Sequence, residues 1–156
     1  FLLNKNDIIK LAENNQVVTD SNNSMKFTLR PVANQSQKTS ADMVTDTGGI
    51  HASLTWNPNP PVIGKNSLGV NFSDALSGNR LNADVNYDLL IRNSTGDVIV
   101  KKNNITALNG ISNQNLSLPS KGEFNLELLV KSLKIPKLTA LDTTRKGIAR
   151  GFVVVS

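Results

Sequence analysis

The sequence predicts an all-β, antiparallel β-sandwich of about seven strands over residues 50–156, preceded by an N-terminal extension over residues 1–49. From residue 50 onward, short segments of alternating apolar and polar residues are separated by Asn, Gly, Pro and Ser. The chain holds 21 Asn, which favours turns over helices because its side chain competes for backbone hydrogen bonds. No helical period lies between the segments, so an antiparallel sandwich is favoured over a βαβ fold.

Each expected strand ends at a residue that interrupts pairing or turns the chain. The prolines of 57–61 cannot donate to a strand ladder, and Ser94–Asp97 has the composition of a hairpin turn. A longer, basic connection from Pro136 to Gly147 separates the last two strands. The seven expected strands cover residues 50–56, 68–72, 85–91, 98–100, 116–118, 124–130 and 148–155.

The extension has a different character. Asp7 is placed to cap a short helix over residues 8–12, and residues 33–49 are expected to be a polar linker. Between them, Met25, Phe27 and Leu29 alternate with polar residues and form an amphipathic strand over 25–31. The linker can span about 56 Å at roughly 3.3 Å per residue. This strand is therefore able to pack on its own sandwich or to enter a neighbouring subunit by strand addition.

The composition excludes most enzyme classes and metal centres. There is no cysteine, so disulfides, thiolate metal sites and cysteine nucleophiles are excluded. His51 is the only histidine, which leaves too few ligands for zinc or blue copper, and no G-x-S-x-G motif accompanies it. Four aspartates lie near strand ends, where Asp commonly stabilises turns: Asp74, Asp84, Asp88 and Asp97. We expect no catalytic, cofactor-binding or metal-binding residues and no enzymatic activity.

Nucleic-acid binding and a membrane span are not expected either. Aromatic residues make up 4% of the chain, and Trp56 and Tyr87 lie within apolar alternation typical of a core. No run approaches 18 apolar residues. The chain begins with Phe1, which suggests a processed product whose signal peptide has been removed.

The net charge of +5 is concentrated in the second half of the chain. Such a surface is able to attract an anionic polysaccharide or an acidic envelope protein, although a solvated face of loops and strands is the preferred interpretation. The basic residues in question are Lys131, Lys134, Lys137, Arg145, Lys146 and Arg150.

Asn-x-Ser/Thr triplets occur slightly more often than chance predicts. All fall in turns, in the linker or on the polar face of an expected strand, as a glycosylated surface requires. The candidate glycosylation sites are Asn22, Asn34, Asn71, Asn93, Asn104 and Asn115.

Residues 51–156 resemble immunoglobulin-like domains of secreted archaeal cell-surface proteins from ammonia-oxidising lineages. The resemblance rests on Trp56-Asn57-Pro58, Val85–Leu89, Ser94–Val98, Gly122–Leu126 and the terminal 147–155 segment. It implies an immunoglobulin-like sandwich and an extracellular or cell-surface location. Members of the group often have Tyr at the position of Phe124, and histidines near 101–104, so neither a tyrosine corner nor a metal role is implied here.

These observations together favour an extracellular structural or adhesive protein, such as a glycosylated pilus or filament subunit. Its mechanism would be donor-strand complementation, with Met25, Phe27 and Leu29 inserted into the next subunit. The alternative is a monomeric secreted module that recognises an acidic polysaccharide or an envelope protein through its basic surface.

Overall fold

The computed structural model describes residues 18–19, 25–26 and 38–156, and the chain divides into two units, Phe1–Ser36 and Gln37–Ser156. In the first unit, β1 (Val18–Thr19) pairs antiparallel with β2 (Met25–Lys26), so that Thr19 lies opposite Met25. The expected helix over residues 8–12 lies outside the described residues. Most of the expected strand over 25–31 does so as well, including Phe27 and Leu29.

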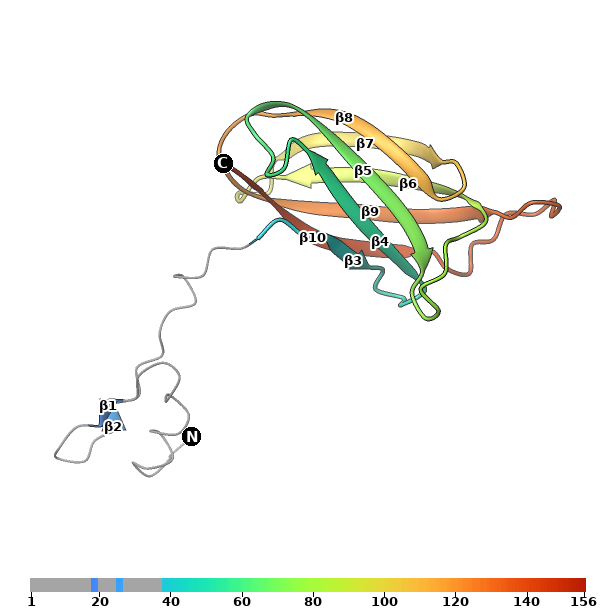
Figure 1. Ribbon diagram of the computed structural model, residues 1–156, viewed down its shortest axis with the longest axis horizontal. Coiled ribbons are helices and arrows are strands. Elements are labelled where there is room, and N and C mark those ends of the chain that lie inside the picture. The colour runs from blue at the N-terminus through green and yellow to red at the C-terminus, as the bar shows by residue number, and fades with distance from the viewer. Residues whose placement is uncertain (1–17, 20–24, 27–37) are drawn as a thin grey trace. The chain divides into compact units, whose positions relative to one another are not determined.

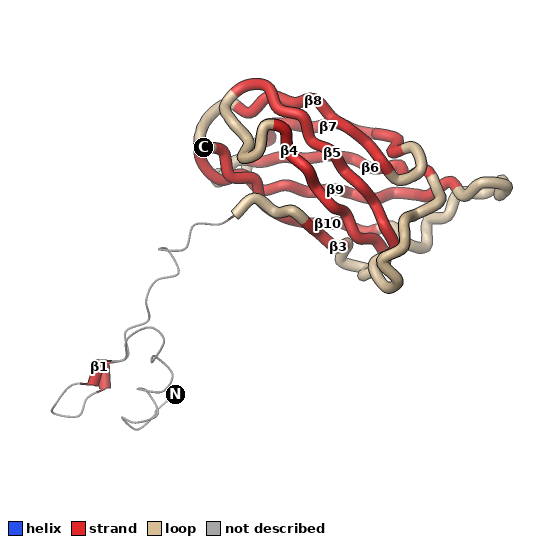
Figure 2. Tube along the Cα trace, in the orientation of Figure 1, coloured by secondary structure: helices blue, strands red, loops and turns tan. Residues whose placement is uncertain are grey.

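The second unit is a sandwich of two antiparallel four-stranded sheets, and Figures 1 and 2 show strands joined by loops at both ends. One sheet has the order β10-β9-β6-β7 and the other β3-β4-β5-β8. No helix occurs among the described residues, so the prediction of an all-β immunoglobulin-like sandwich is confirmed. The strands are β3 (Asp42–Val44), β4 (Ile50–Asn57), β5 (Gly64–Asp74), β6 (Asp84–Arg92), β7 (Val98–Ala107), β8 (Ile111–Leu118), β9 (Gly122–Lys134) and β10 (Gly147–Val155).

The chain crosses between the sheets three times after β4 and β5 have paired. It passes from β5 to β6, returns from β7 to β8, and crosses again from β8 to β9. As a result β5 pairs with β8, and β9 lies between β6 and β10. These crossovers make the core from residues far apart in the sequence.

The core is formed by the inward residues of both sheets. Every second residue of β6 is buried from Val85 to Ile91, as its alternation predicted. Tyr87 meets Phe72 of the facing sheet edge-to-face, with 5.0 Å between ring centroids. Trp56 and Phe124 are also buried, in agreement with their expected places in the core.

The seven expected strands correspond to β4–β10, and β3 is an additional strand. It is formed by residues 42–44, which the sequence assigned to the polar linker. Its central residue, Met43, is buried while its neighbours Asp42 and Val44 are exposed. The three-residue pattern is too short to stand out from a polar stretch.

β7 and β8 are longer than predicted because most of their additional residues are polar, which is tolerated at the edge of a sheet. β7 continues from Val100 to Ala107 through a polar stretch, and β8 begins at Ile111. A strand paired on one side only can carry polar residues at little cost, since many of its side chains meet water.

Candidate interaction surface

The two long sides of the sandwich differ in how their edge strands meet. Figure 1 shows β3 and β10 along one side, and β7 and β8 along the other. On the first side, the main-chain N–H of Ser40 donates to the carbonyl of Phe152 at 2.9 Å, and that of Asp46 donates to Ile148 at 2.9 Å. The Thr39 hydroxyl accepts the N–H of Val154 at 2.8 Å. This side is closed by hydrogen bonds between the sheets, and we call it the closed side.

Two glycines of β10 make room for this closure. A Cβ on Gly151 would lie 2.6 Å from the Ser40 Oγ and 2.5 Å from the Met43 Sδ, and one on Gly147 would lie 2.7 Å from the Thr47 Oγ1. Real side chains do not approach so closely, so glycine at these positions permits residues 40–47 to lie against β10.

The second side, which we call the open side, has far fewer bonds between its strands. β7 and β8 are joined by the turn at 108–110, where the Ile111 N–H donates to the Leu108 carbonyl at 3.0 Å. Beyond it, the bond found from β7 to β8 is donated by the Lys102 Nζ to the main-chain carbonyl of Asn115, at 2.6 Å. An edge strand without a partner leaves main-chain donors and acceptors available for another strand.

The Lys102 side chain bridges β7 and β8 from the core face of the sheet. Lys102 lies directly opposite Leu89, a fully buried residue of β6, so its side chain starts on the core face of the sheet. The stem can cover apolar surface while the ammonium reaches the other sheet. An inward-pointing charge on an edge strand is a known protection against unwanted strand pairing.

Apolar side chains and a surface recess accompany this edge. Ile99, Val100 and Ile105 of β7 are partly buried and pack against the core. On the other sheet, a recess of about 610 Å³ borders β8, lined by Asn115, Leu116 and Ser117 together with four residues of β4 and β5. The open side therefore combines free strand edges with partly covered apolar residues, whereas the recess lies over β4, β5 and β8.

A buried polar network lies in the interior, linking β6 to β8. The Tyr87 hydroxyl donates to the Ser112 Oγ at 2.9 Å, and the Gln114 Nε2 donates to the same oxygen at 2.9 Å. Burial raises the pKa of Tyr87, and its bond to Ser112 opposes that rise. The Tyr87 hydroxyl thus joins the two sheets by a buried hydrogen bond.

Half of the predicted basic surface is neutralised by neighbouring acids. Lys131 pairs with Asp88 at 3.0 Å, and Arg150 lies 3.6 Å from Glu127. Arg145 lies between Asp74 and Asp142. The three basic residues for which no ion pair occurs among the described residues are Lys134, Lys137 and Lys146.

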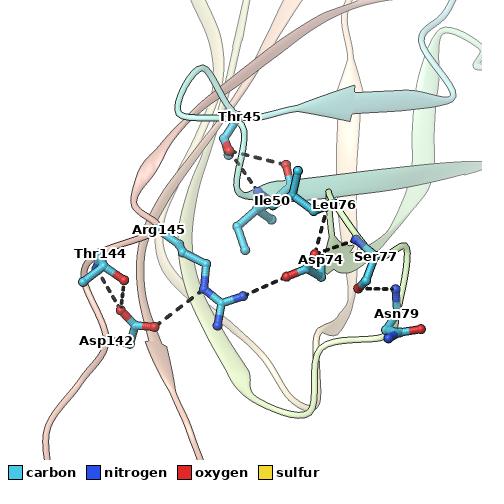
Figure 3. A network of polar contacts seen from close by, with 9 residues as sticks. All are labelled: Thr45, Ile50, Asp74, Leu76, Ser77, Asn79, Asp142, Thr144 and Arg145. Carbon is cyan, nitrogen blue, oxygen red and sulfur yellow. Dashed lines mark hydrogen bonds and ion pairs between the residues drawn. The ribbon is translucent and has the colours of Figure 1, made fainter.

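Arg145 connects the long β9–β10 loop to the end of β5 (Figure 3). Its guanidinium lies 3.3 Å from Asp74 and 3.7 Å from Asp142. The N–H groups of Ser77 and Leu76 hold the pKa of Asp74 below its usual value, with a smaller contribution from Arg145. Bonds from the Thr144 hydroxyl and N–H lower the pKa of Asp142 in the same way, again assisted by Arg145. The network holds the loop against the sandwich.

The predicted glycosylation sites have different environments. Asn71 and Asn115 are exposed on the outer faces of β5 and β8. Asn93 uses its side-chain oxygen to accept the N–H groups of Thr95 and Asp97, and so builds the β6–β7 turn. Asn104 has a φ of 56° in a bulge of β7, where its side-chain oxygen accepts the Lys131 ammonium at 2.6 Å. Asn22 and Asn34 lie outside the described residues.

His51 takes part in a row of side chains across the outer face of one sheet. Its Nε2 lies 3.0 Å from the Asp42 Oδ1 and its Nδ1 lies 3.2 Å from the Ser73 Oγ. These spacings match those of a Ser-His-Asp triad. An acyl-transfer site also needs donors for the oxyanion, whereas the strand backbone around Ser73 is paired with His51 and Arg80. The arrangement is explained by cross-strand bonding that holds β3 to β4 and β5.

Among the described residues, no group of His, Asp and Glu has the arrangement of a metal site, and no helix is long and apolar enough to span a membrane. No protein-family model, curated protein or solved structure matches the chain.

Proposed function

We propose that the chain is an extracellular structural or adhesive subunit that self-associates by strand addition. In this proposal the amphipathic segment 25–31 of one copy pairs with a free sheet edge of the next. The observation that carries it is the contrast between the closed side, bonded along β3 and β10, and the open side at β7 and β8. A head-to-tail contact of this kind does not close on itself and leads to a filament.

The donor segment has properties that fit this role. Its apolar residues Met25, Phe27 and Leu29 alternate with polar ones, and Met25–Lys26 is already in a strand, β2. The described core is filled, because the inward residues of β6 and β9 are fully buried. The incoming strand would therefore extend a sheet at its edge rather than replace a missing core strand.

The cell-surface location, the archaeal lineage and the glycosylation belong to the same proposal. They are supported by the resemblance of residues 51–156 and by the exposure of Asn71 and Asn115. We also propose that the chain is not an enzyme and uses no cofactor, since the His51 row is accounted for by strand bonding.

The test is self-association of the full chain measured by light scattering and negative-stain microscopy. Phe27→Asp with Leu29→Asp places charges on the apolar face of the donor segment and should abolish assembly. Thr28→Asp alters the polar face of the same segment and should leave assembly intact. The proposal is wrong if the unmodified chain remains monomeric at all concentrations, or if the two variants behave alike.

Binding of an acidic polysaccharide is the second candidate. It is favoured by Lys134, Lys137 and Lys146, which lie in or beside the β9–β10 loop without a carboxylate partner among the described residues. Heparin affinity that falls steeply with salt, and falls further in a Lys134→Ala/Lys137→Ala variant, would support this function. Heparin binding that the variant leaves unchanged would contradict it.

A further inference from the structure

We propose that β8 is the edge that accepts the incoming strand, and that Lys102 occupies this edge until the strand displaces it. This inference rests on the proposed strand addition. It assigns the acceptor strand and the residue that limits access to it. The occupant is the segment 25–31 of a second copy of the chain.

Three of the four sheet edges are less suitable than β8. The edges of β3 and β10 are bonded to one another on the closed side. The donor segment carries Lys26 and Arg30, and β7 would oppose them with Lys101 and Lys102. β8 contains no charged residue from Ile111 to Leu118, so pairing with it brings no like charges together.

The geometry of the open side also favours β8. A strand added there would lie about 4.8 Å from β8, above the gap between the two sheets. Its inward residues, Phe27 and Leu29, would then face the partly buried Ile99, Val100 and Ile105 of β7.

A strand can pair with this part of β8 only if it displaces the Lys102 ammonium. The Lys102 ammonium donates a hydrogen bond to the main-chain carbonyl of Asn115 at 2.6 Å. A strand that pairs with β8 competes for that part of the β8 backbone. Displacing a hydrogen bond from a charged donor weakens association by about tenfold or more. The isolated sandwich is therefore protected, and addition occurs only with a strand that covers enough apolar surface to compensate.

The first test is Lys102→Met in the full chain, which keeps the length of the stem and removes the ammonium. It should strengthen self-association about tenfold or more by light scattering. The matched control is Lys101→Met, which removes the neighbouring charge from the outward face of β7 and should have a much smaller effect. Equal effects of the two variants, or weaker association of Lys102→Met, would overturn the role of Lys102.

The second test locates the strand by disulfide capture, which the natural absence of cysteine makes clean. Donor copies carry Thr28→Cys, and acceptor copies carry Phe27→Asp and Leu29→Asp together with one cysteine. An acceptor with Asn113→Cys or Ser117→Cys on the outward face of β8 should be captured, whereas one with Thr106→Cys on β7 should not.

The outcomes separate the two proposals. Capture at Thr106→Cys, or capture at neither strand while filaments still form, overturns the assignment to β8 and leaves strand addition standing. A chain that carries both Thr28→Cys and Ser117→Cys and forms only an intrachain disulfide overturns the second copy as the occupant. No association of any variant overturns the proposed function itself.

Discussion

At the residue scale, Tyr87 provides a measurable link between the two sheets. Replacing Tyr87 with Phe removes the hydrogen bond to Ser112. The buried Ser112 hydroxyl then keeps only the bond from Gln114. The Tyr87→Phe variant should lose about 1 kcal/mol of unfolding free energy, as measured by urea denaturation. A double-mutant cycle with Ser112→Ala isolates the bond, and additive effects of the two substitutions would contradict its contribution.

The carboxylates of the Arg145 network predict a loss of stability in acid. The pKa of Asp74 and that of Asp142 are lowered in the folded state, so their contribution is complete above the unfolded-state value of about 3.9. It is lost as the pH falls below that value and through the lower folded values. The unfolding midpoint should therefore decrease on acidification below about pH 4, with a smaller decrease in Asp142→Asn. If Asp142→Asn has the same pH profile as the natural protein, Asp142 does not contribute to the loss of stability in acid.

His51 is expected to contribute a little to stability and nothing to turnover. Its contact with Asp42 is partly exposed to solvent, so His51→Ala should cost less than about 1 kcal/mol. The rate at which the protein hydrolyses p-nitrophenyl acetate should not depend on Ser73. Fluorophosphonate labelling of Ser73 that disappears in His51→Ala would instead show an active triad.

At the scale of elements, period-2 alternation located β5, β6 and β9 because each contributes a row of buried apolar residues to the core. The turn at 94–97 located β7, and a β-branched apolar run located β10. Alternation was a weaker guide to the full length of the edge strand β7. Asn103 and Asn104 both lie opposite Asp88, and this bulge interrupts the pattern in the middle of β7. β3 was missed because a strand of three residues is held by bonds from its neighbours rather than by its own apolar face.

The closure of the β3–β10 side depends on the absence of a side chain at Gly151. Gly151→Val would bring its side chain into Ser40 and Met43, and we expect a loss of about 1–3 kcal/mol in unfolding free energy. Residues 40–46 should also exchange their amide hydrogens faster than in the natural protein. Gly96→Ala, at a turn residue with a φ of 95° where a Cβ meets no atom within 4 Å, measures backbone strain without a steric clash and should leave exchange at 40–46 unchanged. Unaltered exchange at 40–46 in Gly151→Val would contradict the steric argument.

At the scale of the whole molecule, the difference between the two long sides was not predictable from local sequence. Lys102 follows Lys101 in a polar stretch, and only the pairing with Leu89 places it on the core face. The neutralisation of the predicted basic surface is also tertiary. Asp88 and Lys131 are far apart in the chain, and they meet because β6 and β9 are neighbours, with a register shift next to Tyr87.

Glycosylation and assembly are coupled if both proposals hold, because Asn115 lies on the proposed acceptor strand. On the folded protein, Asn71 and Asn115 should carry glycans, while Asn93 and Asn104 are engaged by the turn and by Lys131. A glycan on Asn115 would crowd the edge of β8, so Asn115→Gln should strengthen self-association of protein from a glycosylating host. Asn71→Gln should not, since β5 is paired on both sides. Intact mass equal to that of the polypeptide would refute glycosylation, and equal effects of the two variants would refute the coupling.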